Sequence, residues 1–558
     1  MKGDSLTDTS TMTASTPTFA APNRGLAWLS GAGGAAIALS LGEFIARFSD
    51  SLQSLVIGVG NFLISITPGN LVATSINNIG AWQKPLLIGG IILASIAVGG
   101  SLGIAHSNNR KVLPIGFLLF GLFGGFATAR DALTSAPASW IVALISAFVG
   151  GATAMMLHYL TRPSDTTEVI ATPGSPLSQS ASRRHALTLG SVAAGATVLT
   201  LGSRIGRTSA AERAREQILL DTATSGGTSA GGTTGGLPQV DLTVGQFDDV
   251  PGLTQFITPI SPSDEFYLID TALTKPRVDP STWTLTINGE FVDTPVTYTY
   301  DDLLARPQVQ REVTLSCVSN PIGGDLVGTA LWEGVLLTDL LEEAGVQDPT
   351  NSAHQFFSRS VDGFTCGFPL PLAYDGRTAM VALKMNGEPL PINHGFPARL
   401  VIAGLYGYVS ATKWLEEISI TDWEGVDGHW IPLGWGKEGP IKTSSRIDVP
   451  QNRTQFEPGT TAIGGIAWNP TIGIERVEVF IGLEPDTPES VWTEVELANV
   501  ESDETWVQWR YEWDAPPGDW IIRVRATDKN GFTQSPIPVA PAPDGAEGYH
   551  TIIVRVAE

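Results

Sequence analysis

Long apolar runs are concentrated in the first third of the chain. The stretch 51–80 is apolar, but Pro68, Gly69 and several asparagines interrupt it, which favours an interfacial or re-entrant segment over a span. We therefore predict a cytoplasmic tail at 1–24 and an α-helical transmembrane bundle at 25–160. Four runs reach the roughly 20 residues that a helix needs to cross a bilayer. They are residues 25–46, 85–106, 112–131 and 138–160.

A fifth, weakly apolar segment at 186–204 follows Ser182-Arg-Arg-His-Ala-Leu187 in the loop 161–185. Twin arginines before such a helix resemble the signal of the twin-arginine pathway, which exports folded proteins. The alternative is ordinary basic charge on the cytoplasmic side of a span. Both interpretations give a cell-membrane protein with five spans and its soluble domains outside the cytoplasm. The cytoplasmic basic residues are then Arg24, Arg110, Lys111, Arg162, Arg183 and Arg184.

Two histidines, His106 and His158, lie near the cytoplasmic ends of the second and fourth spans. A pair of membrane histidines can ligate a haem axially. We interpret these two as polar anchors at the membrane interface, with haem binding as the alternative.

The composition changes after the last span. Residues 205–246 form a linker, and its part 222–238 is so rich in Gly, Ser and Thr that we expect a flexible chain. Up to residue 204 the chain has 11 Lys and Arg against 7 Asp and Glu, whereas the remainder has 22 against 49. A surface this acidic repels phosphates, so nucleic-acid binding is excluded.

Residues 247–440 show a mixed α and β pattern. Trp283–Gly289 alternates like a half-buried strand before an Asn-Gly turn, and 399–403 has the composition of a buried strand. Tyr300–Leu304 indicates a helix start, and Gly334–Ala344 has apolar residues at helical spacing. We predict an α+β domain.

Residues 441–558 alternate between short strands and turns. This pattern predicts an immunoglobulin-like β-sandwich. Its strands are expected at 461–468, 475–482, 505–513, 520–528 and 549–556, and we assign Trp492, Trp506, Trp509, Trp513 and Trp520 to its core and interfaces.

Cys317 lies between a strand-like run and the turn Asn320–Asp325, and Cys366 is the other cysteine of the sequence. A thiol in this position has three interpretations. It can form a disulfide with Cys366, be an inert core residue, or ligate a soft metal as a thiolate.

Several motifs surround these cysteines. They are the Cys317 segment, Asp362–Leu370, the run Asn386-Gly-Glu-Pro-Leu-Pro391 with His394-Gly-Phe-Pro-Ala-Arg399, and Lys413-Trp414. In these motifs, and in Ser445–Asp448 and Arg525–Asp528 of the last domain, residues 250–558 resemble the sulfite oxidase family of molybdopterin enzymes. The resemblance implies a molybdopterin-binding oxidoreductase domain at 247–440 and a dimerisation domain at 441–558, and it leaves a homodimer open.

The resemblance also implies a Mo-molybdopterin cofactor. Cys317 matches the family's molybdenum ligand, which completes a sphere of two dithiolene sulfurs and oxo-type oxygens, whereas Cys366 matches no ligand. His394, Arg399 and Lys413 fit the pterin and phosphate contacts. By position, Tyr267, Ser360 and Thr412 resemble pterin-pocket residues.

The chain departs from the sulfite-oxidising members at the substrate. Their arginines are replaced by the apolar Leu268 and Ile269 after Phe266-Tyr267, by Ile322, and by the uncharged run 408–412. Their metal-side tyrosine is replaced by Phe364. A site with so little positive charge leaves the desolvation of an oxyanion uncompensated, which argues against sulfite.

We therefore expect a membrane-anchored extracytoplasmic oxidoreductase that transfers an oxygen atom to or from a small-molecule or protein-bound S- or N-oxide. Electrons would pass through a separate carrier, a quinone or a cytochrome. The alternatives are a sulfite oxidase or dehydrogenase, and a cofactor-free envelope module for binding or adhesion.

Overall fold

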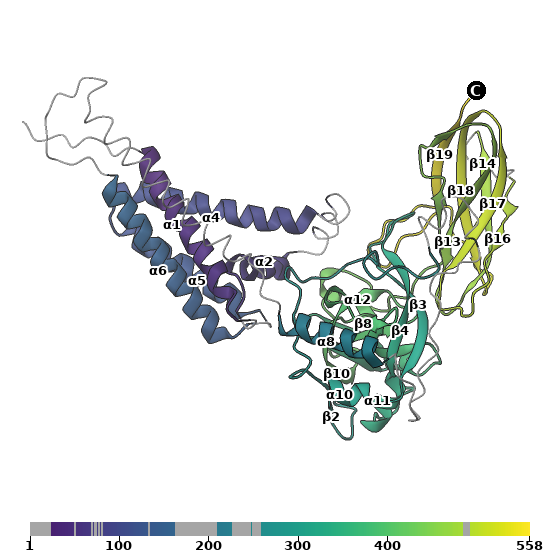
Figure 1. Ribbon diagram of the computed structural model, residues 1–558, viewed down its shortest axis with the longest axis horizontal. Helices are drawn as coiled ribbons and strands as arrows, with labels where there is room; N and C mark the ends of the chain where they lie inside the picture. The colour runs from purple at the N-terminus through teal and green to yellow at the C-terminus, as the bar shows by residue number, and fades with distance from the viewer. Residues whose placement is uncertain are drawn as a thin grey trace, which may run out of the picture.

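Figure 1 shows a computed structural model of the chain, which describes residues 24–49, 52–67, 82–131, 134–161, 209–225, 258–483 and 491–558, and residues 71, 75, 79 and 247. The tail, the twin-arginine motif, the fifth span, nearly all of the loop 161–185 and most of the linker lie outside the described residues.

Four helices of the N-terminal part are long and apolar enough to cross a membrane. They lie close to the four predicted spans and are α1 (Arg24–Ala46), α4 (Gln83–Asn108), α5 (Val112–Ala129) and α6 (Ala136–Leu160). In the stretch 51–80, α2 (Leu55–Ile66) has 12 residues, fewer than the roughly 20 that a span needs. These helices pack into one bundle beside the sheet-containing domains (Figure 1).

Glycines allow α1 and α4 to pack closely and antiparallel. A Cβ at Gly31 would lie 2.0 Å from the carbonyl oxygen of Gly99, and one at Gly103 would lie 2.1 Å from that of Ala27. A larger side chain at either position would separate the helices. The same arrangement places His106, near the end of α4, against His158 of α6, with ring centroids 4.9 Å apart.

Two sheets form the domain that follows. The first has the order β2-β1-β10-β5-β6, and the second has the order β3-β4-β7-β8 with β9 paired to β7. The strands of the first sheet are β1 (Thr284–Gly289), β2 (Val296–Thr299), β5 (His354–Ser360), β6 (Thr365–Pro369) and β10 (Leu415–Asp422). Those of the second are β3 (Val309–Ser316), β4 (Val327–Leu336), β7 (Ala379–Met385), β8 (Glu388–Pro389) and β9 (Arg399–Ile402).

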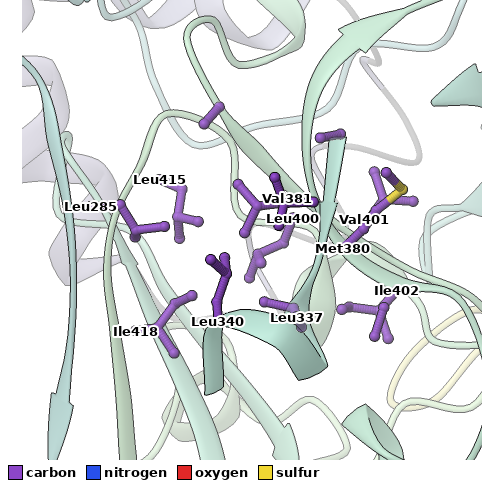
Figure 2. Packing of buried hydrophobic residues seen from close by; sticks show 14 of the residues in the cluster. Leu285, Leu337, Leu340, Met380, Val381, Leu400, Val401, Ile402, Leu415 and Ile418 are labelled. Atoms are coloured by element: carbon purple, nitrogen blue, oxygen red, sulfur yellow. The ribbon is translucent and has the colours of Figure 1, made fainter. Parts of the chain in front are cut away.

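The core of this domain lies between the two sheets. In Figure 2, Leu337 and Leu340 of α11 (Leu337–Glu343) lie between Leu285 and Ile418 of the first sheet and Val381 of the second. Full burial of a leucine contributes about 1.5–3 kcal/mol, so α11 joins the sheets into one unit. The short helices α10 (Tyr300–Leu304) and α12 (Gly407–Ser410) complete the domain.

The predicted helix at 334–344 begins later than expected. Residues 334–336 continue β4, because they pair with β7 from Gly334↔Ala382 to Leu336↔Met380. Apolar residues in the run Gly-Val-Leu fit a buried strand and a helix equally, and the neighbouring strand decides between them. The helix start at Tyr300 is confirmed, with Thr299 and Asp302 forming a capping box.

The C-terminal residues form two sheets around one core, with the orders β11-β13-β17-β16 and β12-β19-β18-β14-β15. Trp509 and Trp513 are buried there, whereas Trp506 lies in a cluster that joins this part to Val318 and Tyr406. The strands are β11 (Ser444–Val449), β12 (Gln455–Phe456), β13 (Gly459–Trp468), β14 (Ile474–Gly482), β15 (Thr493–Glu494), β16 (Glu496–Leu497), β17 (Val507–Ala515), β18 (Gly518–Asp528) and β19 (His550–Val556).

Part of the predicted linker is helical. Residues 210–225 form α8 (Ala210–Ser225), which lies along the middle domain (Figure 1). Arg215 fixes it there by donating from Nε to the carbonyl oxygens of Pro389 at 3.2 Å and Leu390 at 3.0 Å. The sequence Ala-Ala-Glu-Arg-Ala-Arg-Glu favours a helix, so the flexible composition begins only after it.

Candidate active site

Cys317 follows directly on the last residue of β3 and is buried. Its N–H donates to the carbonyl oxygen of Leu326 at 2.9 Å, and its own carbonyl oxygen accepts from the N–H of Asn320 at 3.0 Å. Burial raises the pKa of the thiol, although hydrogen bonds from Ser319 oppose this. Both cysteines are free, so the disulfide interpretation is wrong.

Tyr267 lies next to the Cys317 segment. A Cβ at Gly407 of α12 would be 3.9 Å from Oη of Tyr267 and 4.0 Å from the carbonyl oxygen of Ser316. Burial raises the pKa of the Tyr267 phenol well above its usual value, Cys317 raises it further, and Arg399 lowers it. The phenol is therefore neutral, and Cys317 and Arg399 both lie close enough to shift its pKa.

Arg399 is a buried cation at the start of β9. Its guanidinium lies 4.9 Å from the ring centroid of Trp332, and Nη1 donates to the carbonyl oxygen of His394 at 3.3 Å. In the described part of the chain no carboxylate oxygen lies within 4.0 Å of it. Burial lowers its pKa to about 10, so it is protonated at neutral pH. A buried guanidinium with no anion beside it fits a phosphate group.

His394 and Lys413 complete the cationic side of the site. Nε2 of His394 lies 2.9 Å from the carbonyl oxygen of Ser263, and burial with the nearby charges of Arg399 and Lys413 lowers its pKa to about 4. Lys413 is buried as well, and burial lowers its pKa to about 8. At neutral pH His394 is therefore neutral, with a protonated nitrogen directed at Ser263, while Lys413 is mostly charged.

Sequence reasoning missed Asp270, whose carboxylate pairs with Lys413 at 2.6 Å and with Lys84 at 3.1 Å. It also pairs with Lys275. Burial favours the neutral acid, but the three ammonium groups outweigh it and hold the pKa of Asp270 well below its usual range. No sequence signal was available, because Lys84 lies 186 positions earlier, near the beginning of the apolar helix α4.

Ser360 is the last residue of β5 in the first sheet, Thr412 directly precedes Lys413, and both are buried. Oγ1 of Thr412 lies 2.8 Å from Oγ of Ser358 and 3.0 Å from Sγ of Cys366. Oγ of Ser360 accepts from the N–H of Asp362 at 3.4 Å. The structure thus brings Cys317, Tyr267, Arg399, His394 and Lys413 close enough to affect one another's pKa values, whereas the side chain of Thr412 lies in a network with Ser358 and Cys366.

A small cavity lies beside the Cys317 segment, between the middle domain and the C-terminal sheets. Gln534 and Ser445 meet there through a hydrogen bond of 2.6 Å, and Ile322 lies against Gly548. Every side chain that lines it is uncharged: Ser316, Asn320, Pro321, Ile322, Gly323, Tyr406, Ser444, Ser445, Trp468, Gln534, Ala546 and Gly548.

These residues fit a molybdopterin cofactor. A buried thiol can serve as one soft donor to the metal, which would keep it deprotonated. Arg399 has the charge and the donors that a phosphate requires, and none of the carboxylates that the structure describes lies within 4.0 Å of it. Tyr267 relates the thiol side of the site to the cationic side, because Cys317 and Arg399 both shift its pKa.

Comparison with known proteins agrees with this chemistry. Residues 272–430 match the family described as oxidoreductase molybdopterin binding domain. The mitochondrial sulfite oxidase of Rattus norvegicus is 27% identical over 332 residues, which are 51% of this chain and 58% of that protein. The uncharacterized oxidoreductase YuiH of Bacillus subtilis is 34% identical over 161 residues, which are 29% of this chain and 76% of that protein.

Among solved structures, the sulfane dehydrogenase SoxCD of Paracoccus pantotrophus aligns with a TM-score of 0.44 and 20% identity over 60% of this chain and 96% of that chain. The chain spans little more than half the length of the mitochondrial relatives, 58% for the rat protein. The family match includes six of the seven predicted site residues, and Tyr267 lies just before it.

Proposed function

Because the chain belongs to the sulfite oxidase family of molybdenum-cofactor-dependent oxidoreductases, we propose that it transfers an oxygen atom to or from an uncharged S- or N-oxide. When bound, the cofactor supplies the two-electron chemistry that oxygen-atom transfer requires. The observation that supports this substrate class is the uncharged lining of the cavity beside Cys317. A sulfite dianion entering it would lose hydration with no cation to replace it.

The chain's own residues have separate roles in this proposal. Cys317 holds the metal through its thiolate, and Arg399, His394 and Lys413 hold the pterin and its phosphate. Tyr267, Ser360 and Thr412 form the wall of the pterin pocket.

The substrate side of the site has polar but uncharged groups. The hydroxyl of Tyr406 and the second N–H of the Gln534 amide are donors at the cavity that can orient an S=O or N–O group, whereas the hydroxyl of Ser445 already donates to Gln534. Such a site would discriminate by polarity rather than by charge. The cavity of about 20 Å³ has room for about one water molecule, so an oxide, small or protein-bound, needs it to widen.

The proposed location is the outer face of a membrane. The soluble part contacts the bundle through Lys84, at the beginning of α4, which is the end opposite to Arg110 and Lys111. The five-span topology assigns Arg24, Arg110, Lys111, Arg162, Arg183 and Arg184 to the cytoplasmic side, where basic residues concentrate. Arg47, Lys84 and Arg130, and the four arginines 204, 207, 213 and 215 after the fifth predicted span, belong to the other side, so the proposed location rests on the number of spans and not on the total charge.

We also propose a second copy of the chain and an electron carrier as partners. We assign the C-terminal double sheet to an immunoglobulin-like dimerisation domain, which leaves a homodimer as a further arrangement. Electrons pass to or from a separate quinone or cytochrome carrier in the membrane or beside it.

The test uses the full chain, purified in detergent from a host that makes the cofactor. The purified protein should contain molybdenum and pterin in about equal amounts. In the presence of the protein, members of a panel of S- and N-oxides should oxidise a reduced dye. Sulfite with an oxidised dye is measured alongside. Faster turnover of sulfite than of every oxide would favour the sulfite-oxidising alternative, and absence of molybdenum and pterin would favour the cofactor-free module.

A further inference from the structure

Asp270 is a buried carboxylate with three ammonium partners from three separate segments. Its side chain is 6% exposed, and Oδ1 accepts from Nζ of Lys84 at 3.1 Å. Oδ2 accepts from Nζ of Lys413 at 2.6 Å and also from Lys275. One carboxylate therefore links a membrane helix, its own loop and the cation beside the proposed pterin site.

The loop around Asp270 is fixed to the bundle at two further points. Besides the carboxylate, Nζ of Lys84 donates to the carbonyl oxygens of Asp270 at 3.1 Å and Ala272 at 2.8 Å, so all three of its protons have acceptors. Leu273 packs on α2, because a Cβ at Gly60 would lie 2.5 Å from its Cδ1. The helices α2 and α4 thus hold the loop in one conformation.

This conformation determines where Lys413 lies. Its ammonium group has two acceptors, Asp270 and the carbonyl oxygen of Asn393 at 3.1 Å. A buried ammonium group needs fixed partners, because it cannot exchange them for water. If the loop moves, the partner of Lys413 moves with it.

The cluster also has more positive than negative charge. Lys84, Lys275 and Lys413 face Asp270, and Asp362 is the other acid nearby. Burial raises the pKa of Asp362, which weakens its contribution as a charge. A net positive field therefore remains for an anion next to Lys413.

We propose that the outer end of α4 is part of the cofactor-binding apparatus, with Lys84 as a positioning residue that orders Asp270 and, through it, Lys413. This inference rests on the proposed function, since it takes Lys413 as a contact of the cofactor's phosphate. The membrane bundle then has a role beyond anchoring, because it stabilises the pocket that retains the cofactor.

The experiment compares cofactor retention in full-length protein in detergent. Four proteins are incubated: wild type, Lys84→Met, Lys84→Arg and Lys111→Met. The molybdenum that stays bound to each protein is measured over time by mass spectrometry, and the bound pterin by fluorescence. Lys111 is the matched control, because it is an exposed lysine at the opposite end of the bundle. Lys84→Met should release the pterin about tenfold faster, a change of about 1.4 kcal/mol. Lys84→Arg, which keeps the charge, and Lys111→Met should behave like wild type.

A second variant leaves every charge in place. Gly60→Leu displaces Leu273 and with it the loop around Asp270, so it should also accelerate the release of pterin. It replaces Lys84→Met in the comparison if Lys84→Met does not fold. The inference is overturned if Lys84→Met releases pterin at the wild-type rate, or if Lys84→Met and Lys111→Met accelerate the release equally. If Lys84→Met does not fold, a wild-type release rate in Gly60→Leu overturns it instead. Wild-type protein that contains no molybdenum or pterin would instead overturn the proposed function.

Discussion

The hydroxyl of Thr412 lies 3.0 Å from Sγ of Cys366, and the same sulfur is 3.4 Å from Oγ of Ser358. The second cysteine is therefore held in a small buried polar network between β5, β6 and the segment before Lys413. Burial raises the pKa of its thiol, against the hydrogen bonds from Ser358 and Thr412. Cys366 is a neutral structural thiol, and its role differs from that proposed for Cys317.

The two cysteines should respond differently to substitution. Cys317→Ser should lower the molybdenum content at least about tenfold. Even the loss of a group that only hydrogen-bonds to a metal ligand lowers metal affinity by about that factor. Cys366→Ala should keep the metal and lower the free energy of unfolding by about 1–2 kcal/mol, because Thr412 and Ser358 lose a buried partner. Metal analysis and urea denaturation measure the two effects. Equal metal content in Cys317→Ser and wild type would refute the ligand role.

Arg399 should have opposite effects on the empty and the loaded protein. Without cofactor, Arg399→Met removes a buried charge that has no anion beside it, so the free energy of unfolding should stay the same or rise by about 1–3 kcal/mol. With cofactor, the same variant should lose most of the pterin, because the phosphate loses its charge-assisted bonds. Thermal unfolding of both forms and pterin fluorescence provide the measurements.

Arg377 offers a control for this prediction. It is paired with Asp375 at 2.7 Å near the surface, so Arg377→Met should leave pterin retention unchanged. A strong loss of stability in cofactor-free Arg399→Met would show that the guanidinium is a structural group and not an anion site.

The contact between the C-terminal sheets and the Cys317 segment should weaken in acid. Nδ1 of His550 accepts from the N–H of Ile447 at 3.0 Å, and its ring lies against Gly323. Burial, with the charge of Arg446 nearby, lowers the pKa of His550 from 6.5 to about 4. A base whose pKa is lower in the folded state binds its proton less well there, so stability is full above pH 6.5 and falls as the pH drops toward 4.

We expect a loss of about 1–2 kcal/mol from this group, which allows for the partial exposure of its ring. His550→Asn can keep an acceptor at the same place without titrating. Urea denaturation followed by tryptophan fluorescence at pH 7.5 and pH 4.5, as assay conditions, should show a smaller pH effect in His550→Asn. Identical pH effects in the two proteins would assign the acid sensitivity to other groups.

Much of the fold could be predicted from local pattern. The strand at Trp283–Gly289 and the buried strand at 399–403 correspond to β1 and β9, because alternation and continuous apolar runs report burial directly. The boundary at Gly334 could not be predicted, since pairing with β7 extends β4 to Leu336. The helix α8 in the predicted linker was missed although its composition favours a helix; only its position on the middle domain, held by contacts of Arg215 with a strand far along the chain, left no local signal.

The site was predictable only where residues lie in sequence motifs. Cys317, His394 and Arg399 stand in such motifs, whereas Asp270 and Lys84 do not. Their importance follows from an ion pair between a loop and the apolar helix α4, and a pairing over 186 positions leaves no local signal. Similarly, the sequence gives no sign that Thr412 directs its hydroxyl toward Cys366.

A cation introduced beside Cys317 should shift the substrate preference toward anions. Ile322 lines the uncharged cavity and is partly exposed, so an arginine there can reach solvent while it places a charge near the substrate. Ile322→Arg should raise kcat/KM for sulfite relative to that for a neutral sulfoxide by about tenfold or more, since one charge-assisted bond is worth about 1.5–3 kcal/mol. Ile322→Met is the matched control, because methionine, like arginine, is long and unbranched but has no charge. If both variants change the ratio equally, the effect comes from the shape of the cavity, and the uncharged lining is not what excludes sulfite.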